Sequence, residues 1–176
     1  MQDQTSRDLS VRLGDFAAEI PHLARRFFGF VTAAPLSPRE QAEADALLAP
    51  ASAALFWAQP RQDQRHGVDV MHAVLRSRPG DRLAAETALL HDVGKRHSRL
   101  GAIGRSAATA AAAGGLPLPA RWVEYLRHGE LGASDLAAAG SDSFIVEFTR
   151  IHPGPPPAGV DVARWQAIAS ADQDAA

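Results

Sequence analysis

A histidine and an aspartate stand side by side at the end of an apolar run. His91 and Asp92 directly follow residues 83–90, which read LAAETALL. Adjacent polar side chains at the inner end of a core helix are costly unless they are hydrogen-bonded, paired or bound to an ion. Because they point about 100° apart, only an ion at the helix edge can draw in both. Imidazole with carboxylate suits a divalent transition metal, manganese or magnesium.

Two further residues of these types stand in other predicted helices. His66 lies in the opening turn of its helix, one turn before Val70. Asp172 takes the next place on the apolar face of the last helix, after Trp165 and Ile168. An acid on a buried face needs a cation or several donors. Taken alone, each residue has a plainer explanation. His66 could be a half-exposed histidine that caps its helix, and Asp172 could be a charge on a frayed helix end.

Helix signals run along the whole chain, whereas no alternation typical of a strand persists. Ser37-Pro38-Arg39-Glu40 reads as a capping box that opens a helix closing before Pro50. Upstream, the apolar residues between Leu13 and Val31 recur at helical spacing, and Pro21 is expected to break that helix. Further helices are expected over about 51–58, 63–78, 82–93, 99–113, 119–128, 130–139, 143–151 and 161–172, and a proline-rich loop over 152–159.

These signals predict an all-α fold. We expect a compact helical bundle of residues 60–176 that carries the metal centre, with residues 1–59 as an N-terminal helical arm packed on it as one structural unit. Asp63 and Asp81 are the expected caps of the helices that carry His66 and His91, and Gly94 suits a helix exit.

The order of these residues resembles the H…HD…D pattern of the HD-domain superfamily. The likeness covers about residues 60–174 and rests on His66, the run His91-Asp92-Val93-Gly94-Lys95, and Ala171-Asp172 on the terminal helix. Members of that superfamily are all-helical, and most characterised ones hydrolyse phosphomonoesters or phosphodiesters with a bound divalent metal. The resemblance implies that His66, His91, Asp92 and Asp172 hold one metal ion.

His128 and His152 stand between the histidine–aspartate pair and the last aspartate. Superfamily members with two metals have extra histidines in comparable places, often as a His-His pair, whereas this chain has His152-Pro153. The two histidines are therefore candidates for a second metal or for contacts with substrate phosphate, with surface histidines as the alternative. One or two ions are expected, and manganese, iron, cobalt, nickel, zinc and magnesium are not distinguished.

Two residues are assigned catalytic roles. Asp92 is expected to orient or deprotonate the attacking water, and Lys95 to reach a non-bridging phosphate oxygen. Arg65 and Arg105 are weaker phosphate candidates, better explained as solvated helix faces, and Glu130 is a weaker candidate base.

Three functions fit this pattern. The first is hydrolysis of a phosphate ester, with a nucleotide or another small phosphomonoester as substrate. The second is an HD-fold di-iron oxygenase, which would need His128 and His152 as ligands. The third is a non-catalytic nucleotide-binding HD module, which has no need of all four ligands.

The composition limits which partners, metal ligands and locations are possible. The 176 residues carry a formal charge of −2 with no basic cluster, which argues against a nucleic-acid polymer as partner. There is no cysteine, so metal ligands must be histidines and carboxylates, and no apolar run is long enough to span a membrane. We expect a cytoplasmic protein, and a homodimer if Phe27, Phe28 and Phe30 pack on a second copy.

Overall fold

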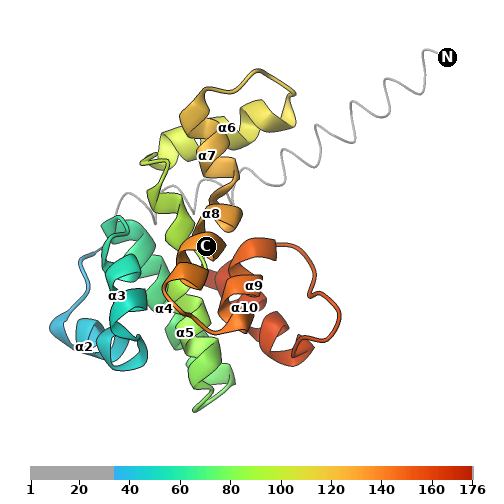
Figure 1. The fold of residues 1–176 in the computed structure, drawn as a ribbon. Coiled ribbons are helices and arrows are strands. Elements are labelled where there is room, and N and C mark those ends of the chain that lie inside the picture. Colours follow the sequence, from blue (N-terminus) through green and yellow to red (C-terminus); the bar gives the residue numbers. More distant parts are fainter. Residues whose placement is uncertain (1–33, 176) are drawn as a thin grey trace.

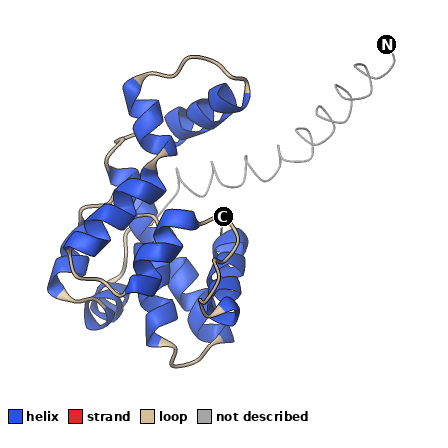
Figure 2. Cartoon of the chain, turned by 45° about the vertical axis from the view of Figure 1, so that its right-hand side comes forward, coloured by secondary structure: helices blue, strands red, loops and turns tan. Residues whose placement is uncertain are grey.

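The computed structural model describes residues 34–175, and within this range every regular element is helical (Figure 2). The all-α prediction is therefore confirmed. The helix expected over Leu13 to Val31, with the phenylalanines assigned to packing or dimerisation, lies outside the described residues. In chain order the elements are α2 (Pro38–Leu47), α3 (Pro50–Trp57), α4 (Arg61–Ser77), α5 (Arg82–Leu90), the short 3₁₀ helix η1 (Val93–Arg96), α6 (Ala102–Ala113), α7 (Ala120–Leu126), α8 (His128–Ala138), α9 (Ser143–Ile151) and α10 (Val162–Ala175).

Helix α5 lies at the centre of the bundle, with α4, α9 and α10 packed around it (Figure 1). Its side chains are mostly small and apolar, and six of its nine residues are buried. Small side chains let neighbouring helices approach closely, and burial of their apolar faces supplies the main stabilising free energy. The neighbours contribute larger groups, among them Met71 of α4, Phe148 of α9 and Trp165 of α10. The C-terminal end of α5 therefore lies in the interior of the molecule.

Helices α2 and α3 belong to the same hydrophobic core. Leu36, Ala44, Leu48 and Phe56 are buried in it, against α5 among others. The capping box is present: the Ser37 hydroxyl accepts from the Glu40 amide, and the Glu40 carboxylate accepts from the Ser37 amide at 2.7 Å. Such a box satisfies backbone amides that the first turn of a helix leaves unpaired.

Helices α6 and α7 project from the bundle as a hairpin, a feature visible in both views (Figures 1 and 2). They pack mainly on each other, and no residue of α7 is buried against the described part of the chain. Ile103, Leu116 and Val123 are exposed apolar side chains of this hairpin.

A buried ion pair joins the hairpin to α4, and it corrects two sequence predictions. Asp63 does not cap α4, whose N-cap is Pro60, but lies inside the first turn and is 4% exposed. Arg105 is not on a solvated face: it donates to both Asp63 oxygens at 2.6 Å. A planar guanidinium matches a carboxylate through two parallel hydrogen bonds. Arg105 also lies over the Tyr125 ring, 5.9 Å from its centroid.

Loss of Arg105 should destabilise the fold strongly, because Asp63 would remain buried without its partner. We expect Arg105→Ala to lower the free energy of unfolding by about 3 to 5 kcal/mol in urea denaturation. The double variant Asp63→Leu/Arg105→Met should recover much of this loss. Arg39→Ala is the matched control, because the Arg39–Glu43 pair is solvent-exposed at the arginine. Equal stability of Arg105→Ala and Arg39→Ala would contradict a structural role for the buried pair.

Candidate metal centre

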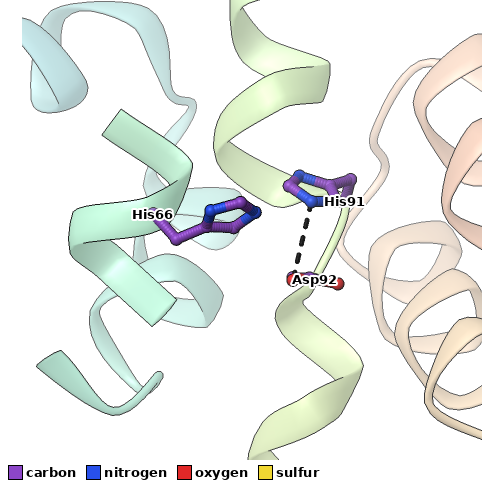
Figure 3. Close-up of side chains that lie close together, drawn as sticks. All are labelled: His66, His91 and Asp92. Carbon is purple, nitrogen blue, oxygen red and sulfur yellow. Dashed lines mark ion pairs between the residues drawn. The ribbon is translucent and has the colours of Figure 1, made fainter. Parts of the chain in front are cut away.

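A close approach between α4 and α5 brings the first two histidines together. A Cβ at Gly67 would lie 3.2 Å from the Leu89 carbonyl oxygen, so the glycine allows the two backbones to come this close. His66 is next to Gly67, and its ring points toward His91 from the neighbouring helix (Figure 3). The two ring centroids are 5.4 Å apart.

His91 presents one unpaired nitrogen to the interior. Its Nδ1 lies 2.9 Å from the carbonyl oxygen of Ala88 and must donate, because a carbonyl only accepts. Its Nε2 is buried and has no hydrogen-bond partner among the described residues. Two carboxylate oxygens lie near this atom, one from Asp92 at 3.5 Å and one from Asp172 at 3.4 Å. A buried nitrogen that faces two carboxylates without a hydrogen bond could serve as a metal ligand.

Asp172 on α10 connects three histidine-bearing segments. His66 Nε2 lies 2.7 Å from its Oδ1, and His152 Nε2 lies 2.9 Å from its Oδ2. Burial opposes ionisation of this carboxyl, but these hydrogen bonds, with the nearby His91, outweigh burial and hold the pKa of Asp172 well below its usual value. The carboxylate is therefore charged. The His152 ring stacks on Phe148, with centroids 4.9 Å apart, and its Nδ1 is buried without a partner in the described chain.

Asp92 lies between Lys95 and the imidazoles. The Lys95 ammonium is bonded to its carboxylate, and His128 Nε2 lies 3.9 Å from Oδ1. Burial raises the pKa of Asp92, but the charges of Lys95 and the neighbouring histidines outweigh it, so the net shift is strongly downward. Burial lowers the pKa of Lys95, and Asp92 more than reverses that shift. Asp92 and Lys95 are thus a buried ion pair.

His128 is held in the same way as His91. Its Nδ1 donates to the Tyr125 carbonyl oxygen at 2.7 Å, and its ring stacks on the Tyr125 ring. Nε2 is left facing Asp92. Burial is the main reason why the pKa of His128 is lowered, so its ring is neutral. Sequence reasoning missed Tyr125; the available signal is a histidine just after a helix end, where its ring can reach the carbonyl oxygen three residues earlier.

Gly94 has a different role from the one predicted for it. Its φ is not positive, so it is not a left-handed helix exit. Instead, a Cβ at Gly94 would overlap the His128 carbonyl and lie 2.6 Å from the Gly132 amide nitrogen. η1 therefore packs backbone to backbone on α8. This contact fixes the distance between Asp92, just before η1, and His128 at the start of α8.

The donor atoms have spacings that one ion could accept. Ligand atoms of His66, His91 and Asp92 all lie within 4.8 Å of one another. Two ligands of one transition-metal ion, each about 2.1 Å from it, are about 3 to 4 Å apart. The 3.4 and 3.5 Å separations around His91 Nε2 fall in that range. Asp172 is not part of the mutually close group, although its Oδ1 lies 2.7 Å from His66 Nε2 and 3.4 Å from His91 Nε2. Two imidazoles and two carboxylates fit a divalent ion, since their negative charges offset its positive charge.

The remaining candidates lie elsewhere or are already engaged. Arg65 bonds Glu40 and the carbonyl oxygen of Pro35, and Glu130 pairs with Arg127 on the surface. His97 contacts Asp135 at 2.7 Å, and Asp174 is exposed on α10.

Comparison with known protein families, with curated proteins and with solved structures gave no match. Within residues 34–175, no helix combines the length and the apolar character that a membrane crossing requires.

Metal uptake should release a proton from His91. Burial lowers the pKa of this imidazole, but Asp92 and Asp172 outweigh burial and raise it to about 9, so the metal-free ring is protonated at pH 7. An ion must displace that proton, so apparent affinity should rise by about tenfold per pH unit below pH 9. Calorimetric titration in buffers of different ionisation enthalpy counts the protons. Binding with no proton release would contradict the assignment of His91 Nε2.

A methyl group at Gly94 should push η1 away from α8. We expect Gly94→Ala to lower the free energy of unfolding by about 2 to 3 kcal/mol, because backbone atoms cannot yield to the new Cβ. Gly114→Ala is the control: its Cβ would meet nothing closer than 3.5 Å. Thermal unfolding of both variants measures the difference, and an unchanged midpoint for Gly94→Ala would refute the close contact.

Proposed function

We propose that the chain binds a divalent metal ion through His66, His91, Asp92 and Asp172 and hydrolyses a small phosphate ester with it. The observation that carries the proposal is the buried, unpartnered Nε2 of His91, which lies within 3.5 Å of both aspartates. In the metal-free protein a proton on the ring partly balances the two carboxylates, and a divalent ion that displaces this proton would balance them more fully.

The bound ion would supply a lowered pKa for water and an electrophile for phosphorus. The protein groups would then divide the remaining tasks. Asp92 accepts a hydrogen bond from the attacking water and orients it. Lys95 shares its ammonium between Asp92 and a non-bridging phosphate oxygen, where negative charge grows during the reaction. His128, neutral and facing Asp92, is placed to donate or accept a proton beside the substrate.

Phosphate esters are favoured over other substrates for two reasons. The residues retain the H…HD…D pattern that resembles the HD-domain superfamily, including Lys95 directly after it. The centre also contains a fixed cation, Lys95, beside the proposed ligands, which suits a dianionic group better than a neutral ester or amide.

Removal of one ligand should abolish both metal binding and turnover. We expect His91→Ala and Asp172→Asn to weaken metal affinity by at least about 100-fold and to reduce hydrolysis to background, with helical circular dichroism retained. The measurements are metal content by atomic emission and phosphate release from a panel of nucleotides and phosphomonoesters, with manganese, cobalt or nickel added.

Asp174→Asn is the matched control, because this carboxylate is exposed on the same helix two residues later. It should keep full metal content and activity. Full metal occupancy in His91→Ala, or loss of metal in Asp174→Asn only, would show that the ligand set is wrong.

A second candidate function is a di-iron oxygenase. It is favoured by one arrangement: each proposed carboxylate ligand has an extra histidine beside it, His152 at 2.9 Å from Asp172 and His128 at 3.9 Å from Asp92. Two ions per chain together with dioxygen consumption would support this function over hydrolysis. One ion per chain with phosphate release would exclude it.

A further inference from the structure

The α6–α7 hairpin leaves several apolar side chains uncovered. Of the large apolar residues that are exposed within residues 34–175, only Val162 lies outside the hairpin and its connecting turn. The others are Ile103, Leu116, Val123 and Leu126, with exposed fractions of 73, 60, 40 and 39%. Single exposed apolar residues are ordinary, but several together on one projecting element indicate an interaction surface.

Helix α7 also lacks the packing that a short helix needs. It is seven residues long, and none of its residues is buried against the described chain. A helix of this length is unstable in water unless a tertiary neighbour covers its apolar side. Tyr125 contacts Arg105 and His128, whereas Val123 and Leu126, three residues apart, share another side of α7. That second side is the one that still needs a neighbour.

The residues that precede the described part of the chain carry much of its apolar character. Four of the seven phenylalanines of the chain stand there, at positions 16, 27, 28 and 30. Phe16, Ile20, Leu23 and Phe27 recur three or four residues apart, so the sequence predicts one apolar face over residues 13–31. A phenylalanine gains free energy only when its ring leaves water. This N-terminal segment, residues 13–31, therefore needs an apolar surface to pack on.

The described chain begins close to the base of the hairpin. The Ala34 carbonyl oxygen accepts a hydrogen bond from Arg65 of α4 at 3.3 Å. Arg65 stands two residues after Asp63, which binds Arg105 of the hairpin. A helix over residues 13–31 would be about 28 Å long, equal to the width of α4, about 10 Å, plus the length of α6, about 18 Å. The N-terminal segment can therefore pass α4 and run along the hairpin.

The covalent connection favours this segment over a second molecule as the neighbour of the hairpin. Only residues 32 and 33 separate it from Ala34. A short connection holds a binding element at an effective concentration on the order of millimolar, whereas a second copy must associate from its concentration in solution.

We propose that the N-terminal segment packs, within its own molecule, on the side of the α6–α7 hairpin that carries Val123 and Leu126. This surface, which the described elements leave exposed, is then an intramolecular interface. The proposal does not involve the metal centre or hydrolysis, so its failure and the failure of the proposed function are separate results.

Cysteine labelling tests the proposal in the full-length chain, which has no cysteine of its own. Val123→Cys places a thiol on the hairpin, and Val162→Cys places one at the start of α10, where the valine is 46% exposed, close to the 40% of Val123. The rate of reaction with a maleimide is divided by the rate of the same variant in denaturant. A covered site reacts only when it opens, so we expect Val123→Cys to react about tenfold more slowly than Val162→Cys. Equal rates would overturn the proposal.

Substitutions in the N-terminal segment identify it as the cover. Leu23→Ser/Phe27→Ser removes part of the apolar face and should raise the rate at Val123→Cys to that at Val162→Cys. His22→Ser/Arg25→Ser is the matched control, because both residues lie away from that face at helical spacing, and it should leave both rates unchanged. Continued protection in Leu23→Ser/Phe27→Ser would show that another element covers the hairpin. If that variant unfolds, both rates rise together, and the two rates in the otherwise unchanged chain decide.

The dependence on protein concentration distinguishes the segment of the same molecule from a second copy. Protection of Val123→Cys that stays constant on dilution supports the intramolecular interface. Protection that appears only where sedimentation shows association would mean that a second molecule covers the hairpin, and the proposal would be wrong.

Discussion

Two carboxylates in contact with histidines set the conditions for the residues around them. Asp92 and Asp172 are both ionised, and the interior must balance their charges. In the metal-free protein Lys95 and the imidazoles do this, and His91 is kept protonated as a result. The groups that balance these charges stand on or next to α4, α5, α9 and α10, so the helices must pack in a way that brings these side chains together. The packing of the helices therefore determines the electrostatics of the centre.

Much of this arrangement could be predicted from local patterns in the chain. Cap residues set the helix starts, as at Ser37 and Asp81, because their side chains act within three residues. His91 and Asp92 stood out because two polar side chains ended an apolar run. Asp172 was placed correctly on the inner face of its helix, where it contacts His66 and His152.

The features that sequence reasoning missed depend on contacts between distant segments. Nothing near Asp63 or Arg105 indicates that they pair, because 42 residues separate them and each alone looks like a helix-surface charge. Gly94 looked like a helix exit, since its actual neighbours, His128 and Gly132, are known only once α8 is packed on η1.

The backbone hydrogen bonds at the two Nδ1 atoms have a consequence for the speed of ion capture. His91 and His128 each donate to the carbonyl oxygen three residues earlier, so both rings already have the orientation in which Nε2 faces the carboxylates. An arriving cation would not have to wait for either ring to turn. Its uptake would be limited by the loss of its own water shell and by the departure of one proton, and the rate should therefore differ between ions according to how firmly each holds water.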